Sequence, residues 1–145
     1  MHAAYPIVVL VANVVWFSMG FTFFSLRARR AARILIPRSA EGEVSAQALT
    51  ASLPFLGGFN LACAALSASY LFSRLGGHAA PPFWHVYVAS AIAHATQWAY
   101  NLPHALRGGR RGGAPWDVLR GPMLFIFVVD GACALLNAGA LLALA

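Results

Sequence analysis

Four apolar stretches, each close to the length needed to cross a bilayer, occupy most of this chain of 145 residues. They extend approximately over Tyr5–Leu26, Ser52–Phe72, Phe83–His104 and Gly121–Ala143. A segment surrounded by lipid must satisfy its own backbone hydrogen bonds, and for a single stretch of this length only a helix does so. The sequence therefore predicts an all-α fold, in which residues 1–145 form one integral membrane four-helix bundle.

The composition favours a membrane location. The chain is 60% hydrophobic and only 10% charged, which is too apolar for an ordinary soluble domain. The first apolar stretch has no basic region before it and no convincing cleavage site after it, so we expect it to stay in the mature protein. Cys63 and Cys133 lie within apolar stretches, and we expect both to be free thiols.

All basic side chains other than histidine are arginines, and nine of the ten lie in the first and third connections between the apolar stretches. The positive-inside rule then places these connections in the cytoplasm and both termini outside. We expect a multi-pass protein of the cell inner membrane, or of the endoplasmic reticulum membrane in a eukaryote. The arginines expected to contact anionic lipid headgroups are Arg27, Arg29, Arg30, Arg33, Arg110 and Arg111.

The first four of these arginines are expected to continue the first helix into the headgroup region, with an acidic partner as the alternative ligand. Because juxtamembrane arginine has this role, the basic charge does not indicate nucleic acid as a partner.

Polar side chains mark one face of the third apolar stretch. Tyr87, Ser90, His94, Gln97 and Asn101 recur at spacings of three and four residues, which places them along one side of a helix. The sequence predicts that this side faces the interior of the bundle.

An ionisable pair is predicted near the bilayer centre. Asp130 lies midway along the fourth stretch, where an ionised carboxylate costs about 3 kcal/mol. His94 lies midway along the third, so antiparallel packing would bring the two residues to one depth, with Asn60 at a similar level. We therefore predict an intramembrane binding site formed by His94, Asp130, Asn60, Gln97 and Asn101.

Two readings of this polar cluster stay open. Imidazole titrates near neutral pH, which favours a proton-responsive or ligand-binding site. The alternative is that the residues only form interhelical hydrogen bonds, each worth roughly 0.6–2 kcal/mol. Asn13 and Asn137, in the outer half of the first and fourth stretches, are expected to be packing residues of the second kind.

A short internal similarity suggests two parallel helical hairpins. Residues 60–68 and 130–138 are identical at five of nine positions, which pairs Asn60 with Asp130 and Cys63 with Cys133. Such repeats are common in membrane proteins. Chance similarity between alanine-rich helices is the alternative.

The sequence has no motif for catalysis, for a metal or for a cofactor. His2, His78 and His85 are expected near the outer surface, and their spacing matches no metal-ligand motif. Mid-membrane histidine occurs on only one helix, which does not favour haem held by two histidines. We predict no cofactor and no metal, and we favour a role other than catalysis.

Three short segments are similar to the ergosterol biosynthetic protein twenty-eight family: Ser18-Met-Gly-Phe-Thr-Phe-Phe-Ser25, Leu56-Gly-Gly-Phe-Asn60, and Phe83-Trp-His-Val-Tyr87 followed by Ala93-His94. The resemblance implies a small four-helix membrane scaffold that tethers sterol-synthesis enzymes. The chain departs from the family pattern at Ala51-Ser52, where the family has Ala-Arg, and at Trp98, where the family has an acidic residue.

Three functional hypotheses follow. The first is a non-catalytic scaffold or subunit of a membrane complex, which meets partner helices or further copies of the chain through small residues and arginine connections. The second is a small proton-linked transporter, or a protein that binds a lipid or small molecule, with His94 and Asp130 at its centre. The third is a membrane enzyme that acts on a lipid through the same two residues.

Overall fold

The computed structural model describes residues 4–36, 43–76, 84–109 and 116–144. Five α-helices and one π-helical segment make up the structure within these ranges. They are α1 (Ala4–Phe21), η1 (Thr22–Leu26), α2 (Ala28–Leu35), α3 (Val44–Leu75), α4 (Trp84–Leu106) and α5 (Gly121–Leu144). The predicted all-α fold class is confirmed.

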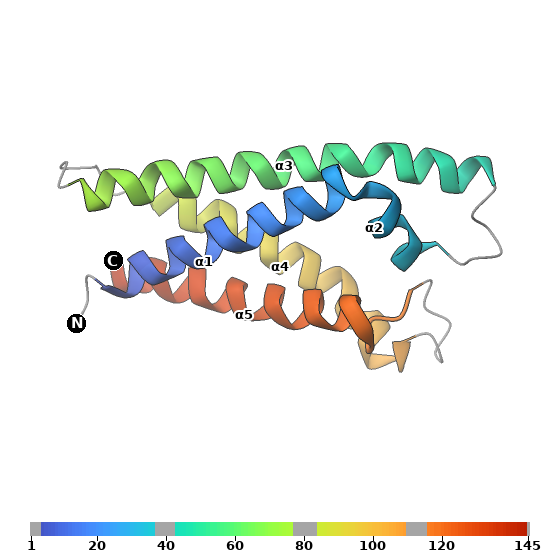
Figure 1. Ribbon diagram of the computed structural model, residues 1–145. Coiled ribbons are helices and arrows are strands. Elements are labelled where there is room, and N and C mark those ends of the chain that lie inside the picture. Colours follow the sequence, from blue (N-terminus) through green and yellow to red (C-terminus); the bar gives the residue numbers. More distant parts are fainter. Residues whose placement is uncertain (1–3, 37–42, 77–83, 110–115, 145) are drawn as a thin grey trace.

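The four long helices alternate in direction. Figure 1 shows that α1 and α4 run one way and that α3 and α5 run the other way. The start of α1 and the end of α5 therefore lie at one end of the bundle, and α2 lies at the opposite end with the end of α4 and the start of α5. The most extensive contacts join α1 to α3 and α4 to α5.

Three helical segments are long and apolar enough to cross a membrane: α1 together with η1, α3, and α5. This supports a multi-pass membrane protein. The predicted third span forms α4, whose 23 residues correspond to about 34 Å of helix, but its hydropathy does not place it among the three. Tyr87, Ser90, His94 and Asn101 of α4 are buried, as the polar stripe predicted.

The structure differs from the sequence prediction in two local features. The arginines after the first span do not continue a straight helix, because α1 passes into η1 and the chain leaves helical geometry at Arg27 before α2 begins. Helix α3 begins at Val44 rather than Ser52 and includes residues expected to be a connector. Hydropathy does not detect either feature, because packing of Ala31 and Ala32 against Leu53 stabilises these polar turns.

Helix α1 crosses the bundle from α5 to α3 (Figure 1). Near its start, the hydroxyl of Tyr5 donates to the backbone oxygen of Leu136 on α5, at 3.0 Å. At the other end, the hydroxyl of Ser25 in η1 donates to the backbone oxygen of Pro54 on α3, at 3.2 Å. The crossing separates η1 from the first turns of α5.

Gly57 allows the close approach of η1 to α3. A Cβ atom at Gly57 would overlap the hydroxyl of Ser25 and lie 2.8 Å from its backbone nitrogen. We expect Gly57→Ala to lower the free energy of unfolding by about 1–3 kcal/mol, because η1 must move to make room. Thermal unfolding in detergent measures this loss. Gly58→Ala is the matched control, since a Cβ there meets nothing within 4 Å; equal unfolding temperatures for the two variants would contradict the prediction.

Candidate functional site

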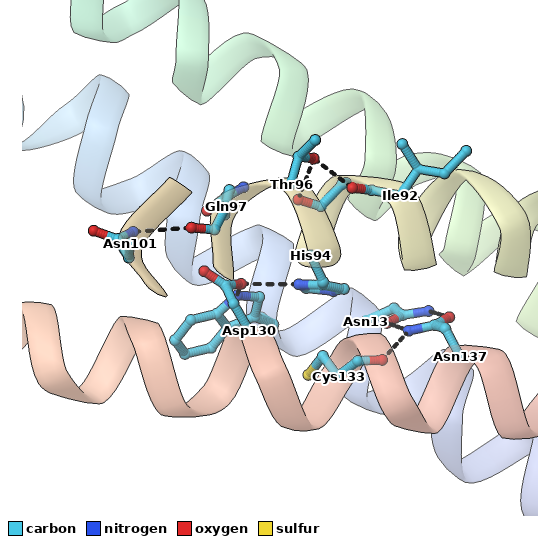
Figure 2. Close-up of polar contacts among 11 residues, drawn as sticks. Asn13, Ile92, His94, Thr96, Gln97, Asn101, Asp130, Cys133 and Asn137 are labelled. Carbon is cyan, nitrogen blue, oxygen red and sulfur yellow. Dashed lines mark hydrogen bonds and ion pairs between the residues drawn. The ribbon is translucent and has the colours of Figure 1, made fainter. Parts of the chain in front are cut away.

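A buried histidine–aspartate pair lies in the middle of the bundle (Figure 2). Nδ1 of His94 on α4 is 2.9 Å from Oδ1 of Asp130 on α5. Both side chains are 0% exposed. The structure thus brings together the two residues that the sequence placed at one depth, and their role in binding stays a prediction.

Two aromatic side chains of α1 pack on this pair. The indole nitrogen of Trp16 donates to Oδ1 of Asp130 at 2.9 Å, and the ring of Phe17 stacks on His94 with centroids 4.7 Å apart. Sequence reasoning missed both residues, because aromatic residues in an apolar span also suit a lipid-facing side. The signal that could have found them is their spacing of three and four residues from Asn13, which places all three on one helix face.

The pair keeps two atoms without a hydrogen-bond partner among the described residues. These atoms are Nε2 of His94 and Oδ2 of Asp130. Buried polar atoms are usually paired, and one left without a partner costs about 1–3 kcal/mol. Each residue keeps one atom that can bond to a further group.

A second polar contact joins α1 to α5 nearer the chain ends. The side-chain amides of Asn13 and Asn137 exchange two hydrogen bonds, of 2.8 and 2.9 Å. The Nδ2 group of Asn137 also donates to the backbone oxygen of Cys133 at 2.8 Å. These bonds fit the predicted packing role of the two asparagines.

The other three residues of the predicted binding site, Asn60, Gln97 and Asn101, have no hydrogen bond to His94 or Asp130 among the described contacts, and α1 supplies the aromatic side chains that pack on the pair. Asn60 donates to the backbone oxygen of Leu56 in its own helix. Asn101 donates to the backbone oxygen of Gln97 and accepts a hydrogen bond of 2.8 Å from the indole of Trp116. The side chains of Asn60 and Gln97 instead line a cavity.

This cavity is partly enclosed, has a volume of about 410 Å³ and lies between the η1 end of α1 and the first turns of α5. Its volume falls within the range of small-molecule sites in proteins. The π-helical turn η1 forms part of its wall, and such turns are rare and often occur at functional sites. The lining residues are Trp16, Ser18, Met19, Gly20, Thr22, Phe23, Phe24, Arg27, Asn60, Gln97, Pro122, Phe125 and Ile126.

Trp16 connects the cavity to the buried pair. Trp16 lines the cavity, and its Nε1 group donates a hydrogen bond to Asp130. The ring of Trp16 also packs edge-on against Phe125 with centroids 5.5 Å apart. The pair therefore holds one wall of the cavity in place.

The predicted headgroup-contacting arginines have different surroundings. Arg27 lines the cavity, whereas Arg29 and Arg33 line a separate groove between α2 and α3. Arg30 is exposed and lines neither of them. Arg110 and Arg111 lie outside the described residues.

The histidines weighed as metal ligands are only partly described. His2 and His78 lie outside the described residues. His85, in the first turn of α4, stacks on Trp84 with ring centroids 3.8 Å apart. The structure therefore gives no geometry for a site formed by all three.

No family model, no curated protein and no solved structure matches this chain. The resemblance to the ergosterol biosynthetic protein twenty-eight family therefore stays a proposal that rests on the sequence segments alone.

Proposed function

We propose that this chain is a multi-pass membrane protein that binds a small, mainly apolar molecule with a polar end group. The cavity between η1 and α5 carries this proposal, because it combines a suitable volume with an apolar wall and a few polar groups. Such a combination is typical of small-molecule sites and fits the predicted lipid-binding or small-molecule-binding role better than an inert bundle.

The lining defines the chemistry of the ligand. Phe23, Phe125 and Ile126 offer surface for an apolar body, and the amides of Asn60 and Gln97 can bond to a polar end. A hydroxyl or carbonyl group suits these amides, because each amide offers both hydrogen-bond donors and an acceptor. The ligand class is therefore an uncharged amphipathic molecule, such as a long-chain or polycyclic alcohol.

In this proposal His94 and Asp130 do not contact the ligand but hold Trp16, which does. The hydrogen bond to Asp130 holds the indole of Trp16, which lines the cavity, and the contact with His94 holds Asp130 in turn. The orientation follows from the arginines: the end that carries α2 faces the cytoplasm, and both termini face outward. Helix α4 then serves as the fourth span, with its polar face turned toward the buried pair.

A photoactivatable probe tests the proposal. The probe is a long-chain fatty alcohol that carries a diazirine, added to the protein in neutral lipid nanodiscs. Ile126→Trp fills the cavity from α5, and we expect it to reduce labelling of the α1–η1 peptide about tenfold, equivalent to about 1.4 kcal/mol of binding free energy.

Val128→Trp is the matched control for the labelling experiment. Val128 lies on the same helix, is 57% exposed and does not line the cavity. Labelling of this variant should equal that of the wild type. Equal labelling of all three proteins, or labels spread over the outer faces of the helices, would contradict the proposal.

A scaffold or subunit role is the second candidate. The observation that favours it is the outer face of α3, where Phe55 and Phe59 are 75% and 74% exposed. Small residues also allow close packing inside the bundle, since Ala64 is buried and a Cβ atom at Gly131 would lie 2.8 Å from the indole of Trp98. A scaffold would keep its partner in Ile126→Trp and lose it when Phe55 and Phe59 are both replaced by alanine.

A further inference from the structure

A groove of about 400 Å³ separates part of α2 from the first turns of α3. Arg29 and Arg33, one helical turn apart on α2, line one side, and Thr50 and Ala51 of α3 line the other. Ala32 also lines the groove, and its small side chain leaves space beside the two guanidinium groups. This groove is distinct from the cavity between η1 and α5.

Packing of α2 holds the two arginines along the groove. The apolar side of α2, with Ala31 and the following Ile36, is buried against Ala46 and Leu53 of α3. This packing fixes the rotation of the short helix, since its opposite side is polar. The arginines are therefore presented by two packed helices rather than by a loose connection.

The charge in the groove is positive and unbalanced within the described ranges. No carboxylate there lies within 4 Å of either guanidinium. The hydroxyl of Thr50 donates its proton to the backbone oxygen of Ala46 at 2.8 Å, so it does not offer this proton to a ligand. Arg29 and Arg33 are the cationic side chains that line the groove. Two guanidinium groups one turn apart suit a phosphate, because each can form paired hydrogen bonds to its oxygens.

The length of α3 places this groove at the level of lipid headgroups. Its 32 residues correspond to about 48 Å of helix, and the hydrocarbon core is about 30 Å thick. Because the apolar stretch of this helix begins near Ser52, the turns from Val44 to Ala51 extend beyond the core at the arginine-rich end.

We infer that the groove between α2 and α3 binds a phosphate ester through Arg29 and Arg33. The ester comes either from an anionic phospholipid headgroup or from a soluble phosphate compound. Arg29 and Arg33 line the groove and the neighbouring Arg30 does not, so the inferred site is more specific than a general attraction of arginine to anionic membranes. Phosphate binding here does not depend on the cavity ligand.

Native mass spectrometry in a neutral detergent tests the inference, with phosphatidylglycerol and phosphatidylcholine added in separate titrations. We expect the wild type to prefer phosphatidylglycerol and the R29Q/R33Q variant to bind it about tenfold more weakly. The control variant R30Q/R120Q removes the same charge at the same end of the bundle and should stay within about twofold of the wild type. Equal losses in both variants, or no preference in the wild type, would overturn the inference.

Two further arms complete the experiment. If R29Q/R33Q does not fold, R29K/R33K takes its place, because it keeps the charge but not the paired hydrogen bonds. Its preference for phosphatidylglycerol over phosphatidylcholine should be weaker than that of the wild type. A preference equal to that of the wild type would overturn the inference. Glycerol 3-phosphate identifies the source of the ester. Displacement of the lipid by glycerol 3-phosphate assigns the groove to soluble phosphate compounds, and retention of the lipid assigns it to membrane headgroups.

Discussion

Replacing Asp130 with alanine is expected to lower the free energy of unfolding by about 3–5 kcal/mol. The substitution leaves the indole nitrogen of Trp16 and Nδ1 of His94 buried without an acceptor. Asp130→Asn keeps an oxygen at the same place, so its loss should be smaller, about 1–2 kcal/mol. Unfolding in mixed micelles of a mild and a denaturing detergent measures both values.

A double-mutant cycle separates this interaction from general packing. His94→Leu removes one partner of the Asp130 carboxylate, and Asp130→Leu leaves both His94 and the indole of Trp16 without their acceptor, whereas the double variant leaves only the indole. The double variant should therefore be more stable than the sum of the single losses predicts, by about 1–3 kcal/mol. Additive losses would show that the two side chains are not energetically coupled.

Asn137→Ala has the second largest expected effect. It removes both hydrogen bonds to Asn13 and the bond to the backbone oxygen of Cys133. Interhelical hydrogen bonds of this kind contribute roughly 0.6–2 kcal/mol each, so we expect a loss of about 2–4 kcal/mol. The same detergent unfolding experiment measures it.

Asn60→Ala is the matched control for this prediction. The amide of Asn60 is also buried, but its hydrogen bond stays within its own helix. Its replacement should cost less than about 1 kcal/mol. Similar losses for the two variants would mean that the amide pair does not join α1 to α5.

The sequence predicts the parts of the structure that depend on periodicity and depth. The spacing of Ser90, His94 and Asn101 identifies the inner face of α4, because a helix repeats its faces every three to four residues. The position of Asp130 midway along the last span indicates that it needs a partner at the same depth. The contact between His94 and Asp130 follows from these two features.

Other parts depend on close contacts that no periodicity encodes. The crossing of α1 from α5 to α3 requires Gly57 opposite Ser25 and Gly20 opposite Asn60. The sequence alone does not show which residue each glycine contacts in the folded chain. The cavity is a consequence of this crossing together with the wider turn of η1. It could therefore not be located from hydropathy or spacing.

The helix α2 shows a third limit of sequence reasoning. Its residues Arg29, Arg30 and Arg33 give a polar composition that resembles an exposed connection. Only the packing of Ala31, Ala32 and Ile36 on α3 makes the segment a separate helix with a fixed rotation. Tertiary contacts decide such short elements, because isolated helices of this length are unstable.

Native mass spectrometry of the protein purified in a mild detergent tests ligand binding in the cavity most directly. The wild type and Val128→Trp should each retain a small molecule above the mass of the chain, and Ile126→Trp should lose it. Collisional release and fragmentation should then identify an uncharged amphipathic compound. A wild type free of any such mass, or the same mass retained by Ile126→Trp, would contradict the proposed binding function.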